Sequence, residues 1–202
     1  MARVQPSLIT QKLFPDIIWN LPNNEKKLYL TFDDGPTPHI TKWILDVLKE
    51  YNAKATFFCL GKNVEKYPDI FNKILEDNHS VGNHSYSHIN GWKTKTKEYL
   101  QDIDIANNII KTSLFRPPYG KIKISQYKYL CKKYKIVMWT VLSKDYNYRI
   151  SNEACFNNVV EYAKEGSVIV FHDSEKAKNN MVYTLPRTIK YFKKLDYEFC
   201  SI

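Results

Sequence analysis

Cysteine is scarce in this sequence, and no two cysteines have the CxxC spacing of a metal or redox site. The four present are Cys59, Cys131, Cys155 and Cys200, and three of them lie inside or beside apolar runs. A free thiol in such surroundings behaves as a small apolar side chain, so we expect reduced cysteines. At 202 residues the chain is long enough to bury a core as one domain without disulfide staples.

Long apolar runs are also absent. Residues 1–22 are interrupted by Gln11, Lys12, Pro15 and Asp16. They therefore offer neither the apolar region of a signal peptide nor the ~20 apolar residues of a membrane span. From this pattern we expect no export, no membrane segment and, by default, a cytoplasmic location.

The basic excess is not concentrated in one place. The chain has 30 Lys and Arg against 21 Asp and Glu, a net charge of +9. This balance suits an anionic partner such as nucleic acid, a membrane surface or a wall polymer. However, the lysines are spread along the chain, with no basic run of five or more residues. We therefore expect no nucleic-acid partner, and a monomer.

Short apolar runs alternate with segments of helical period from about Lys26 onward, which predicts parallel strands joined by helices. The expected strands are Leu28–Phe32, Ala55–Leu60, Ser80–Asn83, Leu114–Arg116, Ile136–Val141, Val168–His172 and Tyr197–Cys200. Apolar residues from Ile40 to Tyr51 recur at helical spacing, and Pro68 suits the first turn of a second helix.

This alternation predicts an α/β fold with about seven parallel strands in a single-domain, distorted or incomplete (β/α) barrel. An open, doubly wound sheet would give a similar string, so the pattern leaves both possibilities open. We expect residues 25–202 to form the domain and residues 1–24 an extension packed on it. The longest irregular pieces are the first ~24 residues and the segments around Gly91 and Asp145.

Two polar clusters at expected strand ends suggest a metal site. Asp33 and Asp34 follow the first apolar run, and His84 and His88 are four residues apart in HSYSH. On a helical turn that spacing puts both imidazoles on one face. Two histidines and one carboxylate leave coordination positions open for water and substrate, as a catalytic zinc site requires. Alone, each cluster also fits a bland reading, either an Asp-Gly turn or two surface histidines.

Two further clusters end later strands. Arg116 begins RPPYG, where it could pair with a buried carboxylate while the loop beyond Pro118 turns an N–H toward a substrate. His172 and Asp173 end a run that is apolar throughout, and Asp145 is a candidate partner for His172. The carboxyl ends of barrel strands form one face, which carries the active site. Four such clusters therefore predict one site.

In order and spacing, these motifs resemble the polysaccharide deacetylase family, also called the NodB homology domain or carbohydrate esterase family 4. The resemblance covers roughly Lys27 to Ile202 and implies a distorted (β/α) barrel. It implies Asp33 as the base, Arg116 as the partner of that base, and His172 as the acid. It also implies Asp34, His84 and His88 as metal ligands, with the backbone N–H of Tyr119 holding an oxyanion.

The implied reaction is the metal-dependent removal of acetyl groups from N-acetylglucosamine-containing polymers such as peptidoglycan or chitin-like oligomers. A divalent ion, best Zn²⁺ but also Co²⁺, Ni²⁺ or Mn²⁺, lowers the pKa of a water, and Asp33 takes its proton. His172, kept protonated by Asp145, donates to the leaving amine.

The chain departs from the family pattern around the expected groove. The DxxDW motif reads Leu142, Ser143, Lys144, Asp145, Tyr146, and Val170 stands where a leucine lines the acetyl-methyl pocket. We therefore expect Pro118, Tyr119, Tyr146 and Val170 to contact substrate, with the substrate itself left open.

Other readings remain open at this stage. The enzyme alternatives are an O-acetyl esterase on a plant or capsular polysaccharide and a metal-free glycosidase that uses Asp33 with Asp173. The third alternative is a low-activity or noncatalytic carbohydrate-binding relative, and the fourth is nucleic-acid binding through the basic surface.

Overall fold

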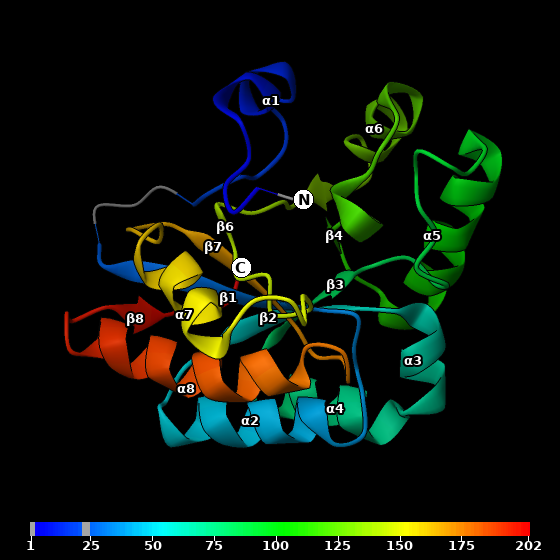
Figure 1. Ribbon diagram of the computed structural model, residues 1–202. Helices are drawn as coiled ribbons and strands as arrows, with labels where there is room; N and C mark the ends of the chain where they lie inside the picture. Colours follow the sequence, from blue (N-terminus) through cyan, green and yellow to red (C-terminus); the bar gives the residue numbers. More distant parts are fainter. Residues whose placement is uncertain (1–2, 22–24) are drawn as a thin grey trace.

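Parallel strands form the centre of the molecule (Figure 1). The structure is a computed structural model and describes residues 3–21 and 25–202. Its strands are β1 (Lys27–Asp33), β2 (Ala55–Cys59), β3 (Ser80–Asn83), β4 (Leu114–Phe115), β5 (Lys135–Ile136), β6 (Val141–Leu142), β7 (Val168–His172) and β8 (Glu198–Phe199).

The strand order follows that of a barrel. The sheet runs β5-β4-β3-β2-β1-β7-β6, with β8 pairing beside β1, and these strand pairings are all parallel. Strands β1 to β5 pair in chain order and β7 returns to β1, whereas the order of a doubly wound sheet reverses midway. The expected α/β, distorted and incomplete (β/α) barrel is therefore confirmed.

The prediction of one strand over Ile136–Val141 is wrong. Two short strands, β5 and β6, stand there instead, at the two ends of the sheet order. Between them Val137 pairs with Ile18 from the N-terminal segment. The N–H of Ile18 donates to the carbonyl of Ile136 at 2.8 Å, and that of Met138 donates to the carbonyl of Ile18 at 2.8 Å. The N-terminal segment thus lies in the gap of the barrel.

Residues 3–21 are less irregular than expected. Helix α1 (Leu8–Leu13) begins after Ser7, whose hydroxyl accepts a hydrogen bond from the N–H of Thr10 at 3.1 Å. Further along, the N–H of Leu21 donates to the carbonyl of Gly166 at 2.8 Å. Residues 1–2 and 22–24 lie outside the described part of the chain, so the division between residues 24 and 25 stays a prediction.

Helices pack on the outside of the sheet, and α2 and α8 lie on the same side of β1 and β7 (Figure 1). The remaining helices are α2 (Ile40–Glu50), α3 (Gly61–Lys66), α4 (Pro68–Glu76), α5 (Thr96–Ile110), α6 (Ile124–Leu130), α7 (Asn152–Val160) and α8 (Lys178–Lys193), with a 3-10 turn, η1 (Pro118–Gly120). Helix α4 begins at Pro68, as predicted. None of the described helices has the length and apolar character to cross a membrane.

The alternation of side chains along β1 separates the core from the site. Leu28, Leu30 and Phe32 are fully buried in the cluster that includes the inner faces of α2 and α8. Thr31 and Asp33 point to the opposite face, where both contact the side chain of Arg116. Burial of the apolar face thus fixes which residues of β1 reach the barrel interior.

Candidate active site

The polar clusters meet at the carboxyl ends of the strands. Asp33 ends β1 beside His172 at the end of β7, and the two are register partners in the sheet. His84 follows β3 directly, and Arg116 follows β4. Because these strands are parallel neighbours, their last residues bring side chains that are far apart in sequence to one face of the barrel.

Among the described residues, one group of three His, Cys, Asp or Glu side chains has its potential ligand atoms close enough together to hold a metal ion. The group consists of Asp34, His84 and His88. Those atoms are all within 4.8 Å of one another. Asp34 Oδ1 is 3.7 Å from His84 Nε2 and 3.1 Å from His88 Nε2. Asp34 Oδ1 is also buried without a hydrogen-bond partner. A buried carboxylate oxygen that faces two imidazole nitrogens fits a divalent cation.

The tautomer of His84 suits a metal ligand. Its Nδ1 is 2.8 Å from the carbonyl oxygen of Arg116, which can only accept a hydrogen bond. Nδ1 therefore carries the proton, and the lone pair is on Nε2, facing Asp34. Burial lowers the pKa of His84 to about 4 and keeps the ring neutral. Burial alone would raise the pKa of Asp34, but the imidazoles, His88 first, hold it below its ordinary range.

The two histidines do not lie on a helical turn, so that part of the prediction is wrong. Residues 84–88 form an irregular loop in which Ser85 and His88 have positive φ angles of 66° and 61°. Side chains support this backbone: Asn83 Oδ1 accepts from the N–H of Ser85 at 2.7 Å, and Asp102 Oδ1 accepts from that of Tyr86 at 2.8 Å. The loop nevertheless places the two imidazole centroids 5.2 Å apart.

Arg116 holds Asp33 inside the barrel. One guanidinium nitrogen, Nη1, donates to Asp33 Oδ1 and to the hydroxyl of Thr31, each at 2.7 Å. The other nitrogens donate to the carbonyls of Val137 at 3.1 Å and Met138 at 2.7 Å. Arg116 is fully buried and Asp33 is 4% exposed. A buried guanidinium with this many partners fixes the position of the carboxylate.

His172 and Asp145 form a second buried pair. His172 Nδ1 is 2.7 Å from Asp145 Oδ1, and the backbone N–H of His172 donates to Asp145 Oδ2 at 2.7 Å. Burial opposes protonation of His172, but the charge of Asp145 and the hydrogen bond to it prevail and raise the pKa to about 9. The imidazole is therefore protonated at neutral pH and can donate a proton from Nε2.

The residues expected to contact substrate differ in exposure. Tyr119 is 58% exposed, and its hydroxyl is 3.1 Å from His88 Nδ1. The Tyr146 ring stands edge-on to His172, with centroids 4.9 Å apart. By contrast, Pro118 is buried and Val170 is only 1% exposed. Tyr119 thus presents surface beside His88 and Tyr146 presents surface beside His172, whereas Val170 presents almost none.

A sequence model of the family described as polysaccharide deacetylase matches residues 20–138, more than half of the chain. A peptidoglycan-N-acetylglucosamine deacetylase of Bacillus cereus is 31% identical over 204 residues, which span 96% of each protein. This chain belongs to the polysaccharide deacetylase family. With that family it belongs to the hydrolases that act on carbon–nitrogen amide bonds.

The polysaccharide deacetylase fold extends over almost the whole chain. A crystal structure of the Bc1960 peptidoglycan N-acetylglucosamine deacetylase superposes with a TM-score of 0.89 at 33% identity, covering 98% of this chain and 95% of that one. A longer relative, the peptidoglycan-N-acetylmuramic acid deacetylase of Bacillus subtilis, is 37% identical over 156 residues. That match covers 74% of this chain and 33% of the relative.

Two neutral residues that support the candidate site were missed in the sequence. Thr31 accepts from Arg116 and donates to the carbonyl of Ile169 at 2.9 Å. Asn180 Nδ2 donates to the carbonyl of Asp145 at 2.9 Å. A threonine in a strand and an asparagine at the start of a helix carry no spacing signal, so only the three-dimensional arrangement reveals them.

Asp173, the second carboxylate of the glycosidase reading, supports the loop after β1. Its Oδ2 accepts from the Thr41 hydroxyl at 2.7 Å, and its N–H donates to the carbonyl of Asp33 at 3.0 Å. A Cβ added to Gly35 would come within 1.8 Å of Asp173 Oδ2. Burial raises the pKa of Asp173 to about 7. These contacts explain the glycine in the DDG sequence as a close approach to Asp173.

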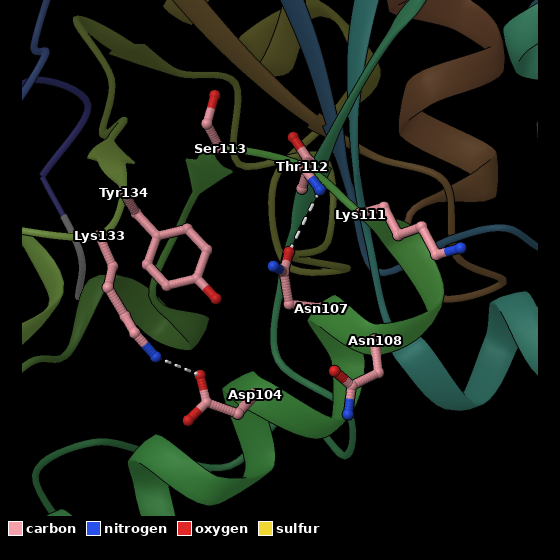
Figure 2. A pocket seen from close by; sticks show the side chains of 8 residues that line it. All are labelled: Asp104, Asn107, Asn108, Lys111, Thr112, Ser113, Lys133 and Tyr134. Carbon is pink, nitrogen blue, oxygen red and sulfur yellow. Dashed lines mark hydrogen bonds and ion pairs between the residues drawn. The ribbon is translucent and has the colours of Figure 1, made fainter.

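A hollow of about 630 Å³ lies away from this site, between the end of α5 and the start of β4 (Figure 2). Within it Lys133 Nζ is 3.1 Å from Asp104 Oδ1, and the N–H of Thr112 donates to Asn107 Oδ1 at 3.2 Å. Thr112 and Ser113 precede β4, so the hollow is at the amino end of that strand. It is therefore at the opposite end of the barrel from the candidate active site.

Proposed function

We propose that this protein hydrolyses the N-acetyl groups of an N-acetylglucosamine-containing polymer, with peptidoglycan as the first candidate and chitin-like oligomers as the second. The observation that carries the proposal is the meeting of three units at one barrel end. These units are the Asp34, His84 and His88 group, the Asp33–Arg116 pair and the Asp145–His172 pair. The names of the peptidoglycan deacetylases to which the chain is similar support the choice of polymer.

One divalent cation would be held by Asp34, His84 and His88, best Zn²⁺ and otherwise Co²⁺, Ni²⁺ or Mn²⁺. When bound, such an ion lowers the pKa of a water and polarises a carbonyl oxygen. Asp33 Oδ2 is 4.0 Å from His84 Nε2, so the base lies beside the ligand group rather than within it. The two adjacent aspartates are thus proposed to do separate work, Asp34 as ligand and Asp33 as base.

Asp33 is proposed to take the proton of the attacking water. Its Oδ1 is occupied by Arg116, which leaves Oδ2 as the acceptor. The backbone N–H of Tyr119 is proposed to face the developing oxyanion, where one preorganised donor contributes about 3 kcal/mol.

His172 is proposed to protonate the leaving nitrogen. An amine without that proton would depart as a strongly basic amide anion, so the breaking of the C–N bond needs an acid. The pKa of about 9 provides one at neutral pH, because Asp145 holds the imidazole in its charged form. The products are acetate and a free amino sugar.

Acetate release tests the proposal. Metal-loaded protein is incubated with peptidoglycan fragments, chitin oligomers and acetylated xylan, beside an Asp33→Asn variant. A matched control is Asp104→Asn, which changes the same charge at an exposed pair with Lys133 far from the site. We expect acetate from the N-acetylated glycans with wild type and the control, and at least 100-fold less with Asp33→Asn.

Three results would count against the proposal. Full activity in the presence of a chelator would remove the role of the metal and favour a metal-free enzyme. Acetate from xylan alone would favour the O-acetyl esterase. If neither wild type nor Asp33→Asn released acetate from any of the three substrates, a noncatalytic carbohydrate-binding protein would be favoured.

A further inference from the structure

A second hollow opens on the substrate face beside Asp145 and His172. It has a volume of about 690 Å³ and lies between the loop after β6 and the start of α8. Tyr148, Lys176 and Lys178 are among the residues that line it. A volume of this size is within the ~300–1,000 Å³ range of small-ligand sites. We call it the lysine hollow.

Residues of the lysine hollow contact Asp145 and Tyr146, which in turn contact His172, the proposed proton donor. Asn180, which lines it, donates to the carbonyl of Asp145 at 2.9 Å. Lys176 Nζ lies 5.6 Å from the centroid of the Tyr146 ring, and that ring packs edge-on against His172. A glycan whose acetamide lies at His172 would therefore pass the lysine hollow with a neighbouring part of the same chain.

The charged side chains that line the lysine hollow are all positive. Its lining includes two lysines and no carboxylate side chain. Among the described residues neither lysine has a carboxylate within ion-pair distance, and both are exposed. The nearby Glu153 does not line the hollow, and its Oε2 accepts from the Tyr183 hydroxyl at 2.7 Å. Two ammonium groups without a carboxylate partner attract an anion.

Tyr148 supplies a surface for a sugar ring. It is 77% exposed, and Arg149 lies 5.6 Å from the centroid of its ring. An exposed aromatic side chain offers an apolar face with a polar tip, which suits the mixed apolar and hydroxyl surface of a saccharide. The lining thus offers both an aromatic surface that suits a sugar and two cations that suit a negative charge.

We infer that the lysine hollow binds a carboxylate-bearing sugar unit of the polymer next to the unit that is deacetylated. The inference rests on the proposed function and narrows it, because chitin-like chains carry no carboxylate. In peptidoglycan the carboxylate has two sources, the lactyl group of a muramic acid that carries no peptide and, where a peptide is attached, the peptide itself. The lysine hollow would therefore select peptidoglycan over neutral N-acetylglucosamine oligomers.

Binding measured separately from turnover tests this inference. Calorimetry compares three tetrasaccharides in which every amino group of the sugars carries the same N-propionyl group: a neutral tetramer derived from chitosan, a peptidoglycan tetramer without peptide, and the same peptidoglycan tetramer with peptide. The variant is Lys176→Ala with Lys178→Ala. The control is Lys193→Ala with Lys194→Ala, an equal charge change about 22 Å further along α8.

We expect the Lys176/Lys178 variant to bind the carboxylate-bearing tetramers roughly three- to tenfold more weakly than wild type. Binding of the neutral tetramer should change less than twofold, and the control variant should match wild type throughout. If the variant binds the peptide-free tetramer more weakly, the lactyl carboxylate is the ligand. If it binds only the peptide-bearing tetramer more weakly, the ligand is in the peptide.

The inference is overturned if the variant binds all three tetramers as tightly as wild type. It is also overturned if the control variant loses as much affinity for the carboxylate-bearing tetramers as the Lys176/Lys178 variant does. It is also overturned if the neutral tetramer is weakened as strongly as the charged ones. Failure of the proposed function looks different. In that case wild type would release no acetate from any glycan, whatever the binding data show.

Discussion

Arg116 has more polar partners than any other residue of the proposed site. Its side chain donates to Thr31, Asp33 and two main-chain carbonyls, and it lies 4.0 Å from the centroid of the Phe58 ring. A planar guanidinium with donors in fixed directions can satisfy all of these partners together, whereas an ammonium cannot. Its pairing with Asp33 therefore depends on the shape of arginine as well as on its charge.

We predict that Arg116→Lys destabilises the fold by about 2 to 4 kcal/mol, because at least two buried acceptors lose their donors. Urea unfolding measures this change as a lower midpoint. Arg187→Lys is the control, since Arg187 is exposed and donates only to the carbonyl of Tyr183. Equal midpoints for wild type and Arg116→Lys would show that lysine can replace these bonds.

The pH dependence of turnover should report His172. Because its pKa is raised to about 9, the acid form is present at neutral pH and is lost as the pH rises through that value. A divalent ion on Asp34 cancels part of the negative charge around His172, so kcat should fall with a midpoint at or below about pH 9.

Asp145→Asn should move that alkaline limb to lower pH. The variant removes the charge that raises the pKa but leaves the burial that lowers it. The midpoint should therefore move by about two units or more, toward or below the ordinary histidine value of about 6.5. Rate profiles from pH 5 to 10 measure this shift, and an unmoved limb in Asp145→Asn would assign it to another group.

At the scale of elements, the seam between β5 and β6 is the least regular part of the barrel. The two strands are consecutive in sequence yet stand at opposite ends of the sheet order. Ile18 supplies both a donor and an acceptor between them, and the Thr140 hydroxyl donates to the carbonyl of Trp19 at 2.9 Å. Backbone groups that would otherwise lack partners are thereby satisfied.

We predict that Ile18→Pro lowers the free energy of unfolding by about 1 to 3 kcal/mol, since the carbonyl of Ile136 loses its donor. Ile18→Val keeps both backbone bonds and should cost less than about 1.5 kcal/mol. Urea unfolding followed by tryptophan fluorescence compares the two variants. Equal stability of both would show that the bridge contributes little.

Local patterns predicted the elements well where neighbouring residues decide the outcome. Helix α4 begins at Pro68 because proline suits the first turn, and β1 and β7 match the apolar runs. The segment from Ile136 to Val141 has the composition of one strand, but a partner 119 residues away, Ile18 at Val137, determines its path. Such a long-range pairing leaves no mark in the local sequence.

At the scale of the whole molecule, the barrel turns scattered residues into one site. The charged members of that site could be predicted because aspartates, histidines and an arginine at strand ends are chemically conspicuous. Thr31 and Asn180 could not, since neutral hydrogen-bonding residues occur throughout any fold. The helical turn expected for HSYSH was wrong because Asn83, Ser85 and Asp102 stabilise a loop with positive φ angles.

Metal binding should stabilise the whole molecule. An ion that binds only the folded state at 100 times its dissociation constant adds about 2.7 kcal/mol. For a domain of this size that should raise Tm by roughly 5–10 °C. Thermal unfolding of chelator-treated protein with and without Zn²⁺ measures the shift. His88→Ala should abolish most of it, whereas His39→Ala, which changes an exposed histidine outside the group, should not.

Arg116 contacts the site in two ways, through its side chain and through its main chain. Its side chain holds Asp33, whereas its main-chain carbonyl orients His84. Every amino acid has that carbonyl, so a substitution at position 116 can disturb the base and still spare the ligand. In evolutionary terms the base and the metal ligand can be lost or kept independently of each other. A descendant of this chain could lose turnover in one step while retaining its ion, and from there drift toward recognition without catalysis.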